Sequence, residues 1–154
     1  MPTLNVSTNV PVDAVVASDI LKDCTRIVAK IIGKPESVRT PVSVFVPPVQ
    51  HFLLLHFFFA FAMHNSVYTY CFLQAQYVMI LINGGVPIAF AGSEEPAAYG
   101  EVISIGGLGP SVNAKLSFAL AEILETKLSV DSSRFYIKFY DVQRSFFGFN
   151  GSTF

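Results

Sequence analysis

Charged residues are scarce in this chain of 154 residues, because Asp, Glu, Lys and Arg make up 14% of it, against roughly a quarter in typical globular domains. Ten Lys and Arg nearly balance eleven Asp and Glu, so the net charge is −1. This balance supplies no basic field for a phosphate backbone. We therefore expect no nucleic-acid partner.

Cysteine is also scarce, with only Cys24 and Cys71 present. Two cysteines cannot make a disulfide framework, and Cys24 falls on the apolar stripe of a predicted helix, which favours a buried, reduced thiol. The first residues show no basic segment followed by an apolar run, so no secretory signal is visible. We expect a cytoplasmic protein, for which any passage to the extracellular space would be unconventional secretion.

Charge is missing altogether between Arg39 and Glu94, a stretch of 54 residues. Most of this stretch belongs to a segment of foreign composition, Val38–Gln76, which holds all three His and seven of the fifteen Phe but none of the ten Gly. Its most apolar part, residues 52–63, has 12 residues, fewer than the roughly 20 that span a bilayer. A membrane hairpin is thus the weaker alternative, and no membrane span is expected. The histidine spacings of five and eight bring no two imidazoles together on a helix, so no metal site is predicted.

A coding explanation fits this segment better. Every Val codon begins with GT, Gln can be encoded by CAG, and pyrimidine-rich codons yield Phe, Leu and Ser. These are the marks of an unspliced intron that begins at Val38 and ends at Gln76. Removing its 39 residues joins Ser37 to Tyr77 and leaves 115 residues. We hypothesise one domain over residues 1–154, interrupted by a retained intron at 38–76.

Hydrophobic periodicity predicts the elements of the first half. Residues 4–8 alternate between apolar and polar, as in a strand with one buried face that begins at residue 3. An apolar stripe from Ile20 to Ile32 predicts an amphipathic helix, capped by Asp13 or Ser18. Gly33, in a left-handed conformation, and Pro35 would end this helix.

The second half repeats the same order of elements. Residues 77–82 and 101–105 read as strands, and residues 86–90 as a short strand paired with the first of them. A helix with its stripe from Leu116 to Leu128 opens near Ser111 or Asn113, residues 134–140 form another strand, and the tail is a candidate for one more. Strand, helix, strand therefore occurs twice. This predicts an α+β fold, a two-layer sandwich with two helices on one face of a four-stranded sheet.

Several short motifs carry a family resemblance once residues 38–76 are set aside. They are Met1-Pro2, Gly33-Lys34-Pro35, Ala89–Pro96, Ser104-Ile105-Gly106, Arg134–Asp141 and Gly148–Phe154. In this order they make residues 1–37 and 77–154 closely similar to the macrophage migration inhibitory factor and D-dopachrome tautomerase family, in particular its plant members. The resemblance implies a homotrimer whose sheets wrap a central channel, with three pockets at subunit boundaries.

Two functions are implied by the resemblance. The first is a keto–enol tautomerase, which acts on small aromatic acids such as phenylpyruvate- or dopachrome-like compounds without a cofactor. The second is a cytokine-like module that binds a protein receptor and has weak or no tautomerase activity, and in this reading the form with the insertion is inactive.

Pro2 is the candidate catalytic base. Removal of Met1 would leave a secondary amine, and an amine in an apolar pocket near another cation loses proton affinity, because desolvation and like charge both disfavour the ammonium form. Such an amine is a usable base near neutral pH.

The remaining site residues follow from the resemblance. Lys34 would face the carboxylate or the enolate oxygen of the substrate and stabilise the negative charge that develops, and the backbone N–H of Ile105 would meet the same oxygen. Tyr136 would come from the neighbouring subunit. The substrate-binding set is Ile105, Tyr136, Lys138, Tyr77, Phe147, Phe149 and Phe154.

Departures from the cytokine branch of the family bear on activity. Lys138 stands where that branch has a substrate-contacting asparagine, so a second cation binds the carboxylate or misplaces it. Phe149 replaces an indole and loses its N–H donor. Ala97 and Gly100 occupy the positions of a cysteine pair, which removes a thiol-disulfide role. Tyr77 lies 39 residues further from Lys34 along the chain.

Overall fold

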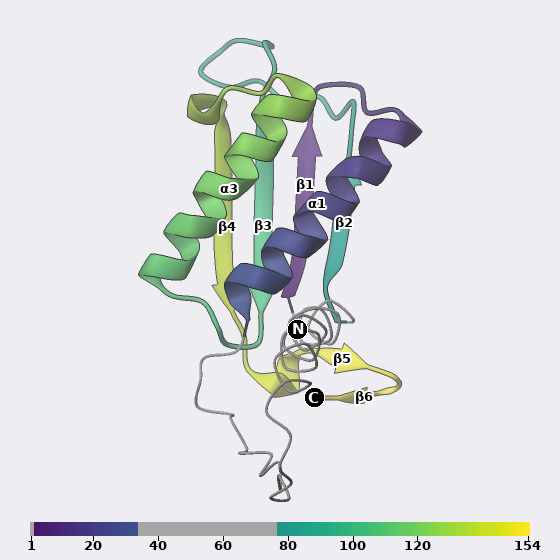
Figure 1. Ribbon diagram of the computed structural model, residues 1–154, viewed down its shortest axis with the longest axis vertical. Coiled ribbons are helices and arrows are strands. Elements are labelled where there is room, and N and C mark those ends of the chain that lie inside the picture. Colours follow the sequence, from purple (N-terminus) through teal and green to yellow (C-terminus); the bar gives the residue numbers. More distant parts are fainter. Residues whose placement is uncertain (1, 34–76) are drawn as a thin grey trace, which may run out of the picture.

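The computed structural model describes residues 2–33 and 77–154, which form a four-stranded sheet with two long helices on one of its faces (Figure 1). The strands are β1 (Pro2–Thr8), β2 (Met79–Asn83), β3 (Ala98–Ser104) and β4 (Phe135–Asp141), and the helices are α1 (Ala14–Ile32) and α3 (Pro110–Leu128). The order in the sheet is β2-β1-β3-β4. The predicted α+β sandwich of two strand-helix-strand units is confirmed.

Pairing in the sheet shows the duplication directly. β1 and β2 run parallel, as do β3 and β4, while β1 and β3 are antiparallel and join the two units at the centre. Alternate residues of β1, from Pro2 to Thr8, are buried against the helices. They meet the stripes of α1 and α3 in one core that includes Leu4, Val28, Leu120 and Leu124.

Helix α1 begins where its cap was predicted. The Asp13 carboxylate accepts hydrogen bonds from the N–H groups of Val15 (2.8 Å) and Val16 (2.9 Å), which otherwise have no partner inside the helix. The expected left-handed Gly33 is wrong, because its backbone has φ −34° and ψ 128° and the chain leaves the helix extended.

Helix α3 begins at Pro110, with Gly109 before it. The Asn113 side chain accepts a hydrogen bond from the Gly109 N–H at 3.2 Å. Of the two predicted residues, Asn113 therefore binds the backbone at the start of this helix, whereas Ser111 makes no capping hydrogen bond. The helix is followed by η2 (Ser132–Arg134), a single 3₁₀ turn that leads into β4.

The short strand predicted at 86–90 is wrong. The N–H of Gly85 donates to the Val10 carbonyl and that of Val86 to the Thr8 carbonyl, so this segment binds the end of β1 and the chain after it rather than β2. Pro87 has no N–H to continue a ladder, and Phe90 bridges only to Ser93.

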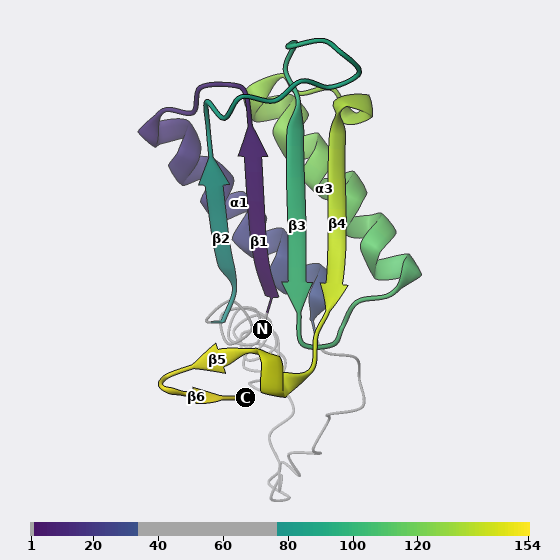
Figure 2. The ribbon, with the colours of Figure 1, turned by 180° about the vertical axis from the view of Figure 1, so that it is seen from behind.

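The tail forms elements of its own rather than another strand of the main sheet. After η3 (Arg144–Phe146), β5 (Gly148–Phe149) and β6 (Ser152–Thr153) make a two-stranded hairpin that stands apart from the main sheet (Figure 2). Asn150 and Gly151 turn it, both with positive φ, the geometry of a two-residue hairpin loop.

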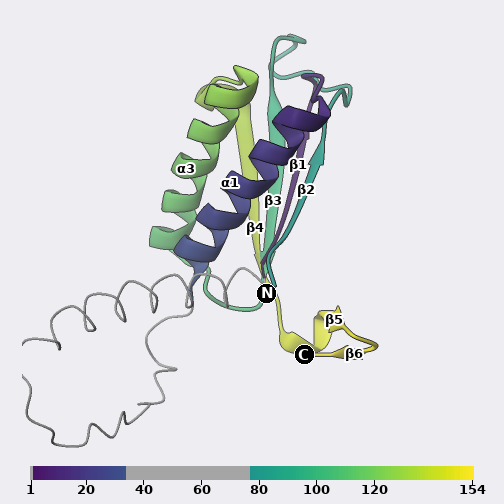
Figure 3. The same ribbon diagram turned by 45° about the vertical axis from the view of Figure 1, so that its right-hand side comes forward.

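Among the described residues, no helix covers the second face of the sheet (Figure 3). Polar residues occupy its central strand β1, with Asn5 and Ser7 hydrogen-bonded to Asn83 of β2. Met79 is 59% exposed and Tyr136 66% exposed at its two sides. We call this surface the open face. Within residues 2–33 and 77–154, no helix is long and apolar enough to cross a membrane.

Candidate active site

Pro2 is the first residue of β1 and is buried. It pairs with Ser104, the last residue of β3, so both lie at one end of the sheet. The C-terminal hairpin lies at the same end, close to the N-terminus in all three views (Figures 1, 2 and 3). The candidate base therefore sits at an end of the sheet where several chain segments meet.

A locked turn carries Ile105 at this end. The Ser104 hydroxyl donates to the Gly106 carbonyl at 2.7 Å, and the Gly106 N–H donates to the Asp141 carboxylate at 2.8 Å. The Val142 N–H donates to the Ser104 carbonyl at 2.9 Å. These bonds fix the backbone on both sides of Ile105, the residue predicted to bind the substrate oxygen.

The end of α1 packs against the same turn. A Cβ atom placed on Gly107 would lie 3.0 Å from both the Cγ2 atom and the carbonyl oxygen of Ile32, the last helical residue. The chain therefore leaves α1 next to the turn that carries Ile105. Lys34, two residues after the helix, lies outside the described residues.

The four predicted aromatic residues form one cluster. The Tyr77 and Phe149 rings meet edge to face with centroids 5.9 Å apart, and Phe149 stacks on Phe154 at 5.4 Å. Phe147 lies 6.2 Å from Phe154, whose N–H donates to the Phe147 carbonyl at 3.2 Å. The structure thus brings Tyr77 together with the C-terminal hairpin although residues 38–76 lie between Lys34 and Tyr77 in the chain.

Tyr136 and Lys138 lie elsewhere in the protomer. Tyr136 pairs with Tyr99, five residues before the Ser104 that pairs with Pro2. At about 3.3 Å per residue, this places Tyr136 roughly 16 Å from the Pro2 row along the strands, and Lys138 about 10 Å from it. Both residues alternate with the buried residues of β4 and so lie on the open face, whereas Pro2 faces the helices.

Lys138 belongs to a polar group on the open face. Its Nζ atom lies over the Tyr140 ring, 4.7 Å from the centroid. The neighbouring Tyr140 side chain, through hydrogen bonding first and Coulomb attraction second, raises the pKa of Lys138 above its ordinary value. Glu101 pairs with Lys138 in the sheet register and accepts hydrogen bonds from the Tyr99 hydroxyl at 2.8 Å and the Tyr140 hydroxyl at 3.4 Å. Lys138 is therefore a cation at neutral pH.

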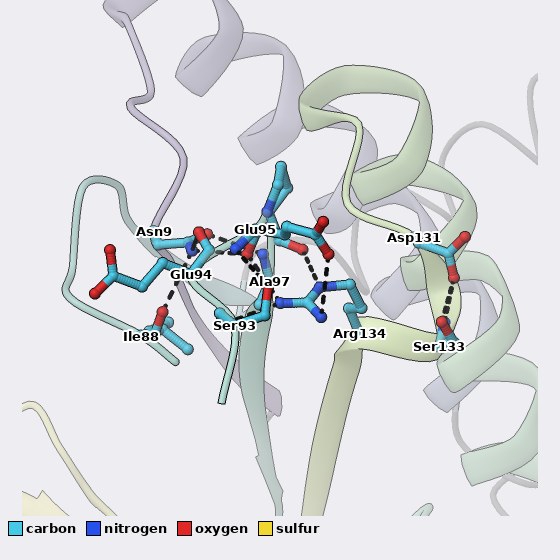
Figure 4. A network of polar contacts seen from close by, with 10 residues as sticks. Asn9, Ile88, Ser93, Glu94, Glu95, Ala97, Asp131, Ser133 and Arg134 are labelled. Atoms are coloured by element: carbon cyan, nitrogen blue, oxygen red, sulfur yellow. Dashed lines mark hydrogen bonds and ion pairs between the residues drawn. The ribbon is translucent and has the colours of Figure 1, made fainter. Parts of the chain in front are cut away.

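A second polar group, at the opposite end of the sheet, was not predicted from the sequence. Figure 4 shows Asn9 and Arg134 reaching the segment 93–97 between them. The Asn9 amide donates to the carbonyls of Ile88, Glu94 and Glu95, and its oxygen accepts from the Ala97 N–H at 2.8 Å. The sequence signal that could have indicated this group is an asparagine directly after a strand, since its side-chain amide can bind backbone groups of a neighbouring loop.

The cysteine predictions concern residues on the helix side of the sheet. Cys24 is a free, buried thiol, as predicted, and burial first, then the nearby charge of Asp23, raises its pKa to about 12. A Cβ atom on Gly100 would lie 3.2 Å from the Phe135 ring, so a cysteine at this position would crowd the core. Across the described part of the chain, no group of three His, Cys, Asp or Glu side chains could hold a metal ion.

Comparison with known proteins places the chain in a family. The family model described as macrophage migration inhibitory factor (MIF) matches residues 1–56 and 66–154. A macrophage migration inhibitory factor homolog of Trichuris trichiura is 32% identical over 154 residues, covering 100% of this chain and 100% of the relative. The homolog of Brugia malayi is also 32% identical, with coverage of 100% and 99%.

Solved structures agree with this assignment. The macrophage migration inhibitory factor homologue from Prochlorococcus marinus is 28% identical, covers 99% of this chain and 98% of its own, and superposes with a TM-score of 0.69. The macrophage migration inhibitory factor from Trichinella spiralis is 28% identical, with coverage of 99% and 99% and a TM-score of 0.66. The chain therefore belongs to the macrophage migration inhibitory factor family.

Proposed function

We propose that this protein is a cofactor-independent keto–enol tautomerase for small aromatic keto or enol acids of the phenylpyruvate or dopachrome type. The observation that carries the proposal is the buried Pro2 at the sheet end, paired with Ser104 directly before Ile105. A buried amine that can act as the base, next to a fixed backbone N–H that can stabilise negative charge, is what proton abstraction beside a carbonyl requires.

The reaction needs one base and one set of groups for the developing charge. The Pro2 amine, free after removal of Met1, takes a proton from the carbon next to the substrate carbonyl. The electron pair of that C–H bond moves into the new C=C bond, and negative charge develops on the carbonyl oxygen. Lys34 and the Ile105 N–H stabilise this oxygen, which then takes a proton from water and gives the enol, while the Pro2 ammonium group returns its proton to water.

The aromatic cluster supplies the apolar side of the proposed pocket. Tyr77, Phe147, Phe149 and Phe154 would contact the aromatic ring of the substrate, so we expect a preference for aromatic acids. Phe149 offers no N–H donor, so its own part of this wall contributes apolar contact alone. The substrate carboxylate is left to the cations Lys34 and Lys138, the latter from a neighbouring copy, because Lys138 lies on the open face of its own protomer.

A homotrimer would complete the pocket. Within one protomer, Tyr136 lies roughly 16 Å from Pro2 along the strands and on the other face of the sheet. It can reach a pocket of this kind only in a neighbouring copy. Among the described strands, β2 and β4 form the two edges of the sheet, and these edges and the open face are the surfaces that closed association would cover.

The Val38–Gln76 segment is best explained as a retained intron within a single domain of a plant protein located in the cytoplasm. The family fold is present on both sides of the segment, in residues 2–33 and 77–154. Sequencing of the transcript tests this explanation. A spliced messenger that joins the codons of Ser37 and Tyr77 is expected, and genomic exon sequence through the segment would refute it.

The catalytic proposal is tested by phenylpyruvate enolisation with Pro2→Gly. General-base catalysis typically contributes about 100-fold or more, so we expect a loss of this size in kcat. Pro11→Gly is the matched control, because Pro11 is an exposed proline at the other end of β1. Mass spectrometry of each variant shows whether Met1 has been removed. Equal rates for the wild type and Pro2→Gly would remove Pro2 from the mechanism.

A second candidate is a cytokine-like protein-binding module that meets a protein receptor and has weak or no tautomerase activity. The observation that favours it is Lys138, a cation held over Tyr140 and beside Glu101. If this cation misplaces the substrate carboxylate, Lys138→Asn raises the enolisation rate. If it binds the carboxylate productively, the same substitution raises KM.

A further inference from the structure

Arg134 is more deeply engaged than a surface arginine beside a strand. Its side chain is 16% exposed, and its Nε atom donates to the Pro96 carbonyl at 2.9 Å. One terminal nitrogen donates to the carbonyls of Glu95 at 3.1 Å and Ser93 at 3.3 Å. The guanidinium group therefore holds the backbone of the 93–96 segment from the β4 side, opposite Asn9 (Figure 4).

The same guanidinium group lies over an aromatic ring. The Arg134 Cζ atom is 5.3 Å from the centroid of Phe90. Phe90 is fixed at its backbone by two hydrogen bonds with Ser93, at 2.9 and 3.0 Å, which close a tight turn in which Ala91 has a φ of 51°. Arg134 thus holds both the base of this turn, at Ser93, and the ring that the turn carries.

The Phe90 ring contacts Tyr136 in turn. The centroids are 5.0 Å apart with an interplanar angle of 63°, an edge-to-face arrangement. Tyr136 is 66% exposed on the open face. Among the residues that the structure describes, Phe90 is the aromatic ring against which Tyr136 packs, so this contact restricts an otherwise mobile phenol side chain.

Anchoring of the loop alone does not explain this arrangement. Asn9 already binds the backbone of the same loop at Ile88, Glu94, Glu95 and Ala97. A loop anchor on the β4 side does not require an arginine that stacks on Phe90. Nor does it require the Phe90 ring to contact Tyr136, two residues after Arg134. The series Arg134, Phe90, Tyr136 ends on a residue predicted to bind substrate.

We infer that Phe90 and Arg134 are positioning residues that set the Tyr136 side chain for the pocket of a neighbouring subunit. The inference rests on the proposed function, because Tyr136 acts on substrate only if a neighbouring copy completes the pocket. Phe90 and Arg134 themselves do not touch the substrate. They act by limiting the conformations of Tyr136 before substrate arrives, which lowers the cost of ordering it on binding.

A double-mutant cycle on phenylpyruvate enolisation tests the inference. Phe90→Leu keeps the site apolar but removes the edge-to-face contact, and we expect kcat/KM to fall about two- to tenfold, mainly through KM. In a Tyr136→Ala background the same substitution is expected to have no further effect, because the residue that it positions is gone. Phe118→Leu is the matched control, since Phe118 is a 68% exposed phenylalanine on α3. A Phe90→Leu loss of the same size in both backgrounds would overturn the inference.

Arg134 is tested by its conservative replacement. Arg134→Lys retains the charge but loses the planar group that stacks on Phe90 and binds three carbonyls. We expect a rise in KM of the same kind, again absent in the Tyr136→Ala background. An unchanged KM for Arg134→Lys would exclude Arg134 from the positioning role.

A measurement independent of activity separates this inference from the proposed function. With 3-fluorotyrosine incorporated into the full chain, the ¹⁹F resonance of residue 136 is identified by its loss in Tyr136→Phe. Phe90→Leu is expected to move this resonance toward its position in the unfolded protein, whereas Phe118→Leu leaves it unchanged. A resonance that Phe90→Leu does not move would overturn the inference. Equal enolisation by wild type and Pro2→Gly would instead refute the proposed function, and the ¹⁹F result still decides whether Phe90 orders Tyr136.

Discussion

The contact between the Ile105 turn and the end of α1 can be tested by two neighbouring glycines. Gly106 and Gly107 both have positive φ, 70° and 81°. A Cβ atom on Gly106 would meet nothing within 4 Å, whereas on Gly107 it would meet the side chain and the carbonyl oxygen of Ile32 at 3.0 Å. Gly106→Ala therefore tests backbone strain alone, and Gly107→Ala tests strain plus the contact with the helix end.

The expected magnitudes differ accordingly. A non-glycine residue in the left-handed region costs about 1–2 kcal/mol, partly offset by the lower entropy of the unfolded chain, so Gly106→Ala should cost about 1 kcal/mol. Gly107→Ala adds an overpacking term, typically about 1–3 kcal/mol, because the carbonyl of Ile32 cannot rotate away as the end of a flexible side chain would. We expect about 3 kcal/mol in total.

Urea unfolding of the full chain at one protein concentration measures the difference. With a slope of about 2 kcal/mol per molar urea, the midpoint of Gly107→Ala should lie about 1 M below that of Gly106→Ala. Enolisation should fall further in Gly107→Ala, because Ile105 and the chain leading to Lys34 are pushed apart. Equal midpoints for the two variants would show that α1 yields without cost, and would refute the close packing of the helix end.

Three further predictions concern individual side chains. Asp13→Ala removes the acceptor for two N–H groups of α1 and should cost about 1 kcal/mol in urea unfolding, a result that an unchanged midpoint would contradict. Asn9→Ala removes the donor for the carbonyls of Ile88, Glu94 and Glu95 and the acceptor for the Ala97 N–H. It should cost about 1–3 kcal/mol, whereas Asn113→Ala, which loses one bond at the start of α3, should cost less. Because burial raises the pKa of Cys24 to about 12, peptide mass spectrometry after iodoacetamide treatment at pH 8 should find Cys24 alkylated only in denatured protein, and alkylation of the native protein would contradict its burial.

The fold was predictable because its signals are local. Alternation in β1, the Asp13 cap and the apolar stripe of α3 each depend on residues within one element, and the two strand-helix-strand units follow from their order. The failure at residues 86–90 has the opposite cause. Val86 bonds to Thr8 and Ile88 to Asn9, which lie far away in the sequence, so no local pattern reveals that this segment crosses the end of the sheet.

In the candidate site, too, some positions follow from the order of the strands and others depend on contacts between distant segments. Ile105 lies at the Pro2 end because the sheet register puts Ser104 opposite Pro2, and Tyr77 contacts the C-terminal hairpin that lies at the same end (Figure 2). Tyr136 and Lys138 were chosen from the resemblance alone, and their distance from Pro2 depends on where β4 starts relative to β3. The roles of Ser104, Asp141, Phe90 and Arg134 depend on side-chain contacts between distant segments, which composition and spacing do not encode.

Deletion of residues 38–76 is the perturbation from which we expect the largest gain in soluble, active protein. The core should tolerate both forms, because each doubling of a loop adds only about 0.6 kcal/mol of closure entropy. In the second unit six residues, 129–134, join α3 to β4, and without the insertion seven residues, 33–37 and 77–78, would join α1 to β2, so the shorter connection is long enough. The cost of the insertion lies in its composition, since Phe52–Leu55 and Phe57–Phe59 form apolar runs without a neighbouring charge. We expect the deletion variant to be more soluble and to enolise phenylpyruvate faster per mole, as measured by sedimentation and by initial rates. A full chain of equal solubility, oligomeric size and activity would refute the idea that the inserted sequence impairs the protein.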